Sequence, residues 1–258
     1  MTTKRRRIAW LLILLPLYAA CSTTYLGLSG KSGSRDWRTA SREPVGLAPN
    51  PAETPEAVVQ VYAARTISWR GYFGVHTWIA VKPTGADHFR IHEVIGYRLP
   101  RTGTAVVSRE GAPDARWFGA EPELLRDVRG PGVDALIERI EAAVQAYPYA
   151  DTYRIWPGPN SNTFIAFVLR EVPELRVDLP PTAIGKDYLG MVPVALTPSG
   201  TGGQFNLFGV AGIAVGWEEG LELNVLGLTF GVDPASLSIK LPLLGRIGPS
   251  ESDPVFIE

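Results

Sequence analysis

The chain has 258 residues, of which 45% are hydrophobic and 20% charged, and these ordinary values exclude a globally disordered protein. Its 27 glycines and 22 prolines favour many turns over a simple helical bundle. Four of the 25 cations stand at residues 4–7, so the rest of the chain is acidic, with all 26 anions. An acidic body predicts no nucleic-acid partner, because binding phosphate requires a basic face.

The N-terminus has the pattern of an export signal. The cations Lys4–Arg7 precede an apolar run, Ile8–Ala20, and the first twenty residues contain no acidic side chain. The sole cysteine, Cys21, follows directly, and the sequence Leu-Tyr-Ala-Ala-Cys resembles a bacterial lipobox, in which the cysteine is lipidated. Tyr18 departs from the aliphatic residue usual at its position.

Two alternatives to a lipoprotein remain: a signal-anchor helix that continues through Leu28, and plain secretion. All three predict a body outside the cytoplasm, in the cell envelope and facing the periplasm. The first two attach it to a membrane, through a lipid or an anchor. A single cysteine excludes an internal disulfide and leaves no cysteine cluster for zinc.

Composition divides the chain into four parts. Residues 1–20 form the signal, and residues 21–55, rich in Ser, Thr, Gly, Pro and Arg, read as a tether. Residues 56–190 are expected to form an α+β domain. Residues 191–258 are expected to form a Gly-rich β region that packs on the same core.

Strands are predicted first in the α+β domain. Runs rich in β-branched and aromatic residues cover 57–63, 72–81 and 89–99, and 104–107 is a short fourth. Residues 82–87 have turn chemistry. These segments predict an antiparallel meander.

Helices are predicted next, at 121–128, 131–146 and 160–171. The second is the clearest, because one apolar stripe runs along it from Val133 to Tyr147. The third is apolar almost all round, which predicts a buried helix. Residues 202–231 hold eight glycines and long apolar runs, and predict strands without a helix, with a hairpin turn at 218–220.

Two residues suggest chemistry. His76 lies within the second predicted strand, and Ser161 lies in the first turn of the 160–171 helix. Free backbone N–H groups at a helix start favour negative charge, so this position suits a nucleophile and an oxyanion site. The alternative is a helix cap, since Asn and Ser are common in that role.

A carboxylate would complete such a site. If the first turn centres on Thr84-Gly85, antiparallel pairing places Glu93 opposite His76, where it would orient the imidazole. A slip of one residue would bring His92 or Val94 there instead, and a solvated strand face is the alternative role for Glu93.

The order of a strand histidine and a later helix-start nucleophile resembles the circularly permuted papain-like fold, as in NlpC-type and lecithin retinol acyltransferase-like proteins. Those families often open the helix with Asn-Cys, and here the stretch is Asn160-Ser161-Asn162. Serine in place of cysteine puts activity by the same route in doubt, because an alkoxide forms less readily than a thiolate. The oxyanion site or pocket is assigned to Asn160, Asn162, Trp156 and Lys186. The alternative for Lys186 is a surface charge doublet with its neighbour.

Longer stretches resemble a bacterial family of unknown function, number 3750. They are DWRTASREPVGLAP, GYFGVHTWIAVKP, YPYADTYRIWPGPNSNTFIA and LPPTAIGKDYLG, and the resemblance runs from residue 36 to about 246. It implies an envelope protein with an N-terminal membrane signal and no established reaction.

Two functions remain open. One is a hydrolase or acyltransferase acting on an amide or ester, such as a peptidoglycan stem peptide or a lipid, with Ser161 as nucleophile, His76 as base and Glu93 as orienting group. The other is a non-enzymatic lipoprotein that binds peptidoglycan or a protein partner. Neither involves a cofactor or a metal site, since the sequence has no phosphate loop, dinucleotide fingerprint or zinc helix.

Overall fold

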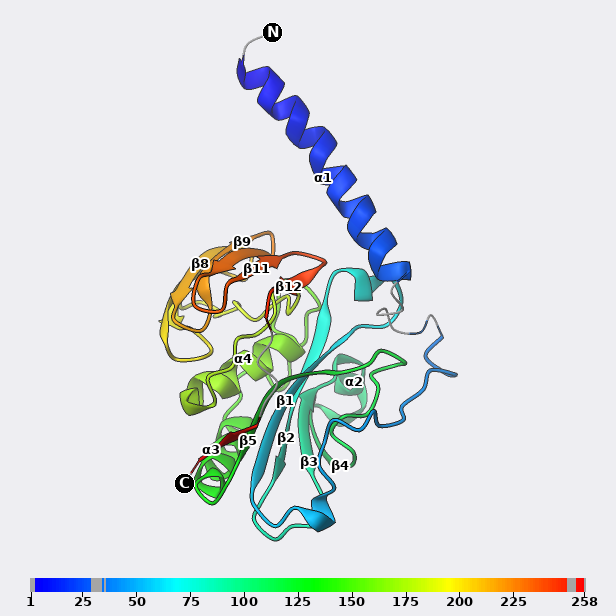
Figure 1. The fold of residues 1–258 in the computed structure, drawn as a ribbon, viewed down its shortest axis with the longest axis vertical. Helices are drawn as coiled ribbons and strands as arrows, with labels where there is room; N and C mark the ends of the chain where they lie inside the picture. The colour runs from blue at the N-terminus through cyan, green and yellow to red at the C-terminus, as the bar shows by residue number, and fades with distance from the viewer. Residues whose placement is uncertain (1–2, 29–33, 35, 250–253, 258) are drawn as a thin grey trace.

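Helix α4 (Ser161–Glu171) lies between two β-sheets in the computed structural model of the chain (Figure 1). The structure describes residues 3–28, 34, 36–249 and 254–257. One sheet packs on α4 through β2, and the other is reached by Arg170 of α4, whose guanidinium donates to Leu196 O and to the side chain of Gln204. The protein therefore has the predicted α+β class.

The first sheet has six strands in the order β13-β5-β1-β2-β3-β4. Their bounds are β1 Val58–Arg65, β2 Val75–Lys82, β3 Arg90–Val94, β4 Val106–Glu110, β5 Glu123–Arg129 and β13 Val255–Phe256. Strands β1 to β4 form the predicted antiparallel meander. A short helix, α2 (Leu99–Thr102), joins β3 to β4.

One face of this sheet carries the main core. Helices α3 (Val133–Gln145) and α4 cover it and bury apolar side chains from both helices and from alternate strand positions, such as Val61, Ile79 and Phe164. The other face carries a second, smaller cluster around Tyr62, Trp78 and Phe89. The predicted helices at 131–146 and 160–171 are both confirmed, including the burial of the latter.

The predicted helix at 121–128 is wrong, because this segment is strand β5. Its apolar residues Leu124, Leu125 and Val128 fit a helical spacing over one turn, but the segment pairs along β1 from Ala63↔Glu123 to Val58↔Arg129, with a bulge. Ladder hydrogen bonds to a buried neighbour outweigh the weak preference of so short a segment.

Where the structure describes it, the segment predicted as a tether is attached to the body; residues 29–33 and 35 of it lie outside the described residues. Residues 21–28 continue helix α1 (Thr3–Leu28), in which Ser22 and Leu26 are buried. Further along, the backbone N–H of Leu47 donates to Asp114 (2.7 Å) and Pro44 forms a bridge with Ala115. Among the described helices, α1 included, none is long and apolar enough to cross a membrane.

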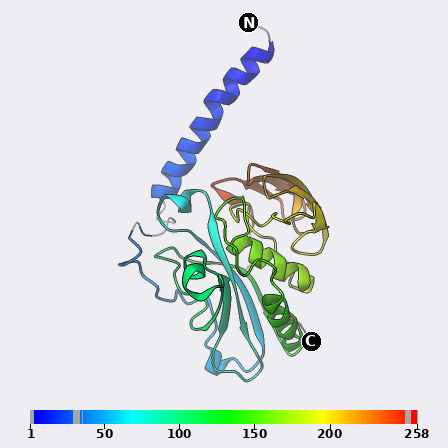
Figure 2. The ribbon, with the colours of Figure 1, turned by 180° about the vertical axis from the view of Figure 1, so that it is seen from behind.

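The second sheet comprises seven consecutive antiparallel strands, β6 to β12. Residues 202–231 form strands without a helix, as predicted. They are β6 Val194–Leu196, β7 Gly202–Leu207, β8 Ala211–Gly216, β9 Gly220–Val225, β10 Leu228–Asp233, β11 Ser238–Leu241 and β12 Gly245–Ile247. The predicted turn at 218–220 joins β8 to β9. Both views place this sheet at the end of the molecule from which α1 extends (Figures 1 and 2).

Candidate functional site

His76 and Glu93 meet on the face of the first sheet that points away from helices α3 and α4. His76 Nε2 lies 2.9 Å from Glu93 Oε2, and both side chains are buried. Arg109 of β4 donates from Nε to the other oxygen of Glu93, also at 2.9 Å, and its side chain is 41% exposed. A chain of three polar groups thus runs from the buried imidazole to the surface.

The contact forms with a different strand register from the one predicted. The observed pairs include Ile79↔His92 and Val81↔Arg90, which shifts β3 by two residues relative to a turn centred on Thr84-Gly85. A shift of two keeps Glu93 on the face of His76 but makes it a diagonal neighbour, still within reach of a long side chain.

Ionisation of Glu93 is controlled by its partners. Burial opposes ionisation, but the hydrogen bond and charge of His76, together with Arg109, outweigh it and hold the pKa of Glu93 below its ordinary value. The carboxylate is therefore charged at neutral pH, and it orients the imidazole of His76.

An indole covers the imidazole. Trp117 stacks on His76 with ring centroids 3.7 Å apart and planes 12° apart, and Trp78 lies next to both rings. Neither Trp117 nor Arg109 was predicted to lie beside His76. Arg109 lies beyond the predicted 104–107 strand, but continuing that strand with its alternation would have placed it on the face of Glu93.

Ser161 lies on the other side of the sheet. Thr77, the neighbour of His76 in β2, points toward α4, and its hydroxyl donates to Asn162 Oδ1 (3.0 Å) and Ser161 O (3.4 Å). Because successive strand side chains point to opposite faces, His76 points away from this helix. The structure joins His76 to Glu93 and does not bring Ser161 to them.

The start of α4 is a complete helix cap. Asn160 Oδ1 accepts from the backbone N–H groups of Asn162 (2.9 Å) and Thr163 (3.2 Å), while Thr163 Oγ1 accepts from Asn160 N (3.1 Å). Two of the N–H groups that an oxyanion site could use at this helix start are therefore already paired. Asn162 Nδ2 donates to Val75 O and Ile184 O, so it ties the helix to β2 and to a neighbouring loop.

The other two predicted pocket residues lie elsewhere. Trp156 is half exposed and donates from Nε1 to Leu226 O (3.0 Å), at a turn of the second sheet. Lys186 is neither a surface residue nor part of the His76 cluster: it is buried and pairs with Glu222 of β9. A small polar cavity beside Glu222, lined also by Asp187, Asn206 and Asn224, contains no residue of the His76 cluster.

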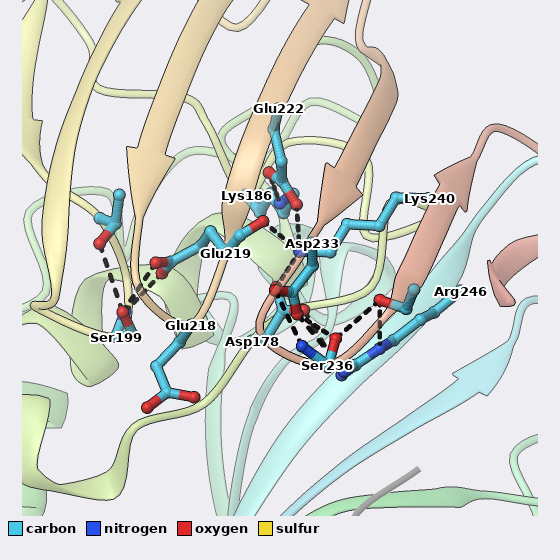
Figure 3. A network of polar contacts seen from close by, with 12 residues as sticks. Asp178, Lys186, Ser199, Glu218, Glu219, Glu222, Asp233, Ser236, Lys240 and Arg246 are labelled. Atoms are coloured by element: carbon cyan, nitrogen blue, oxygen red, sulfur yellow. Dashed lines mark hydrogen bonds and ion pairs between the residues drawn. The ribbon is translucent and has the colours of Figure 1, made fainter. Parts of the chain in front are cut away.

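Lys186 belongs to a buried charge network between α4 and the second sheet (Figure 3). Lys240 Nζ of β11 lies 2.8 Å from Glu222 Oε1 and 2.7 Å from Asp178 Oδ1, so Glu222 contacts both lysines. Burial raises the pKa of Asp178 to about 6, against the attraction of Lys240. Burial also opposes ionisation of Glu222, but the two lysines outweigh it and lower its pKa.

Cys21 is exposed on α1, two turns before the helix ends at Leu28. Close to it, the Tyr18 hydroxyl donates to Pro242 O, just after β11. Among the described residues, no group of three or more His, Cys, Asp or Glu side chains is placed to hold a metal ion.

The fold defines an α+β protein in which a helix separates a mixed six-stranded sheet from an antiparallel seven-stranded one. The sequence model of the family described as "Protein of unknown function (DUF3750)" matches residues 56–188, and the chain belongs to this family. The match covers the first sheet through β5, both core helices and the His76 cluster. It is narrower than the resemblance over 36 to about 246, and leaves out the second sheet. No curated protein and no solved structure matches the chain.

Proposed function

We propose that this protein is a non-enzymatic protein of the bacterial cell envelope, attached to a membrane through its N-terminus. The observation that carries the proposal is the position of Cys21: it follows a charged and then apolar segment, and it is exposed on α1 beside the body. A cysteine there is accessible for lipid attachment, and a lipid on it would hold the body close to the bilayer.

The proposal favours binding over catalysis because the predicted catalytic residues are separated. His76 is covered by Trp117 on one face of the sheet, while Ser161 is on the other and its helix start is capped. Oxyanion stabilisation requires free donors aimed at the reacting atom, and the Asn160 side chain already occupies two of them.

Metabolic labelling with a radioactive fatty acid tests the attachment. The wild-type chain should incorporate label and fractionate with membranes, and Cys21→Ala should lose the label and accumulate as a precursor. Because Cys21 is the sole cysteine, the control cannot be another cysteine. Ser41→Ala, at an exposed serine, is the control for handling and expression. Equal labelling of wild type and Cys21→Ala would contradict attachment through this residue.

A hydrolase related to the permuted papain-like proteins is the second candidate. The hydrogen-bonded pair His76–Glu93 favours it, since a base held by a carboxylate is a requirement of such enzymes. In this candidate Ser161 reacts with an acyl or fluorophosphonate probe, and Ser161→Ala and His76→Ala each abolish the reaction. Absence of a reaction in the wild-type chain, with a known serine hydrolase labelled in parallel, would support the non-enzymatic proposal.

A further inference from the structure

The second sheet has the opposite polarity from a sheet on the surface of a soluble protein. Its inner face, toward α4, is polar and buried, with Gln204, Glu222 and Lys240 among its side chains. Its outer face is apolar and exposed. Sheets that are half buried normally place the apolar face inside, because that face loses most by contact with water.

The outer face is free of charge. The strands β6–β12 are all described, and their outward positions hold only glycine, alanine and larger apolar residues. The large ones are Val194, Leu196, Phe205, Leu207, Ile213, Val215, Leu221, Leu223, Val225, Leu228, Phe230, Val232, Ile239, Leu241 and Ile247. We call this surface the outer apolar face. Exposed fractions near its centre, 46% for Ile213 and 51% for Leu223, show that nothing in the described chain covers it.

The register of the strands cannot be changed to hide this face. A slip of one residue would turn Glu222 and Lys240 outward and break their contacts with Lys186 and Asp178. The buried charge network in Figure 3 therefore fixes which face points outward. This arrangement stabilises the protein only where the outer apolar face is removed from water by an apolar environment.

The membrane attachment point lies at the edge of this sheet. Tyr18 of α1 contacts Pro242, in the turn between β11 and β12, and Ser22 and Leu26 are buried next to the exposed Cys21. In both views α1 and the second sheet lie at the same end of the molecule (Figures 1 and 2). An anchor at Cys21 or along α1 therefore brings the outer apolar face to the bilayer.

The turns add further apolar groups around the face. Trp217 and Leu237 stand at one end of the strands, and Phe208 and Leu226 at the other, all more than half exposed. Aromatic residues are favoured at the boundary between lipid headgroups and acyl chains.

The N-terminal attachment favours a lipid surface over a second copy of the chain. With an anchor at the edge of the second sheet, contact of this face with the bilayer is intramolecular, so even a shallow apolar contact strengthens binding.

We infer that the outer apolar face of β6–β12 lies on the lipid bilayer, as a second membrane contact beside the N-terminal attachment. The inference rests on the proposed membrane attachment and adds its orientation: the second sheet faces the lipid, and the first sheet with its His76 cluster faces away. The body would then be held at two points and could not swing freely on a tether.

A fluorescent dye on single cysteines tests this orientation in the full chain. In the chain lipidated at Cys21, the sulfur of that residue is a thioether and does not react with the dye, so Leu223→Cys places a single dye at the centre of the outer apolar face. Tyr97→Cys places it on a similarly exposed residue just before α2, away from the second sheet. Each chain is reconstituted into vesicles of phosphatidylethanolamine and phosphatidylglycerol through this lipid, with flotation to confirm attachment and circular dichroism to confirm folding.

We expect the dye at residue 223 to be quenched several-fold more strongly by nitroxide-labelled lipid than the dye at residue 97, and less by aqueous iodide. Flotation with equal iodide quenching at both positions would overturn this inference and leave the attachment standing. The dye at residue 223 could instead be shielded from iodide more strongly at higher protein density, without quenching by nitroxide-labelled lipid. That result would indicate contact with a second copy of the chain and would also overturn the inference. Failure of every chain to float would contradict the attachment itself.

Discussion

Glu93 is the residue on which the His76 cluster depends, because it contacts His76 with one oxygen and Arg109 with the other. Its carboxylate is buried, and an uncompensated charge there would be expensive. The two partners compensate it, which lets a buried strand position carry a charge without loss of the fold.

The variant Glu93→Gln should lower the free energy of unfolding by about 2 kcal/mol at pH 7, since a charged hydrogen-bonded group is replaced by a neutral one. The pKa of Glu93 is lowered in the folded state, so its stabilising contribution is present above the unfolded pKa of about 4.3 and is lost as the pH falls through the lower folded value. Urea unfolding of both chains across the acidic range measures this difference.

Glu110→Gln is the matched control, because this carboxylate lies on the adjacent β4 and its side chain is 66% exposed. It should change the stability little at any pH. A Glu93→Gln difference that persists unchanged at pH values well below 4 would show that shape, and not charge, accounts for the loss.

The sequence predicted the His76–Glu93 contact for a partly wrong reason. Alternation along the strands determines which side chains share a face, and this is readable from the sequence. The register depends on how many residues the connecting loop uses, and the loop after Lys82 uses more than the assumed tight turn. The contacts of Arg109 and Trp117 with this pair were not predicted, because these residues come from β4 and from a loop whose position depends on tertiary packing.

At the level of elements, α4 is the most central. Phe164, Ile165 and Val168 are fully buried in the main core, and the helix contacts β2, β3 and α3. Its polar start fastens it to β2 and to the loop at 184–185. The nearly continuous apolar surface seen in the sequence therefore reflects contact on several sides.

Phe164→Ala should reduce the free energy of unfolding by about 3–5 kcal/mol, through lost apolar contact and the cavity left behind. Phe256→Ala is the control, as this phenylalanine on β13 is 67% exposed and should cost well under 1 kcal/mol. Denaturant unfolding measures both. Similar losses for the two variants would contradict the central position of α4.

Asn160→Ala should cost about 1–2 kcal/mol, because two backbone N–H groups at the start of α4 lose their acceptor in a buried place. Asn160→Asp keeps that acceptor and should retain more of the stability, although its charge replaces the donor to Ile155 O and Ile184 O. Thermal unfolding compares the two. A smaller loss for alanine than for aspartate would show that a buried charge beside the carbonyls of Ile155 and Ile184 costs more than the retained acceptor contributes.

Elements were easier to predict where pattern and packing agree. The 131–146 helix has one apolar stripe and one buried face, and the structure gives α3 at 133–145. Strand β5 was missed because seven residues with two adjacent leucines fit either structure, and only the neighbouring β1 decides. The long apolar runs within 202–231 predicted strands, but not that the polar residues between the apolar ones would form the buried face, as in Leu221–Val225.

In the molecule as a whole, buried charges join the second sheet to the segment that follows α4, where Asp178 and Lys186 lie. Lys240 is fully buried and contacts Glu222, Asp178 and the backbone carbonyl of Glu219. Removing one partner of a buried ion pair leaves the others uncompensated, which is far more costly than losing a surface pair.

Lys240→Met should therefore destabilise the chain by about 3–5 kcal/mol and loosen the second sheet from α4. Arg139→Met, which breaks a half-exposed pair with Glu174, should cost about 1 kcal/mol or less. Hydrogen exchange of the amides in β9 and β11 reports the loosening separately from global unfolding. Unchanged exchange in Lys240→Met would show that other contacts hold the second sheet in place.

The position of strand β13 near the end of the chain determines when the first sheet can be completed during synthesis. It pairs in parallel with β5, and Ile257 N donates to Arg129 O, so the edge of the first sheet is completed by a segment that follows the whole second sheet in the chain. Synthesis delivers residues from the N-terminus onward. The edge of β5 therefore stays open until all seven strands of the second sheet have emerged, and during that time it is exposed to any chaperone that binds unpaired strands.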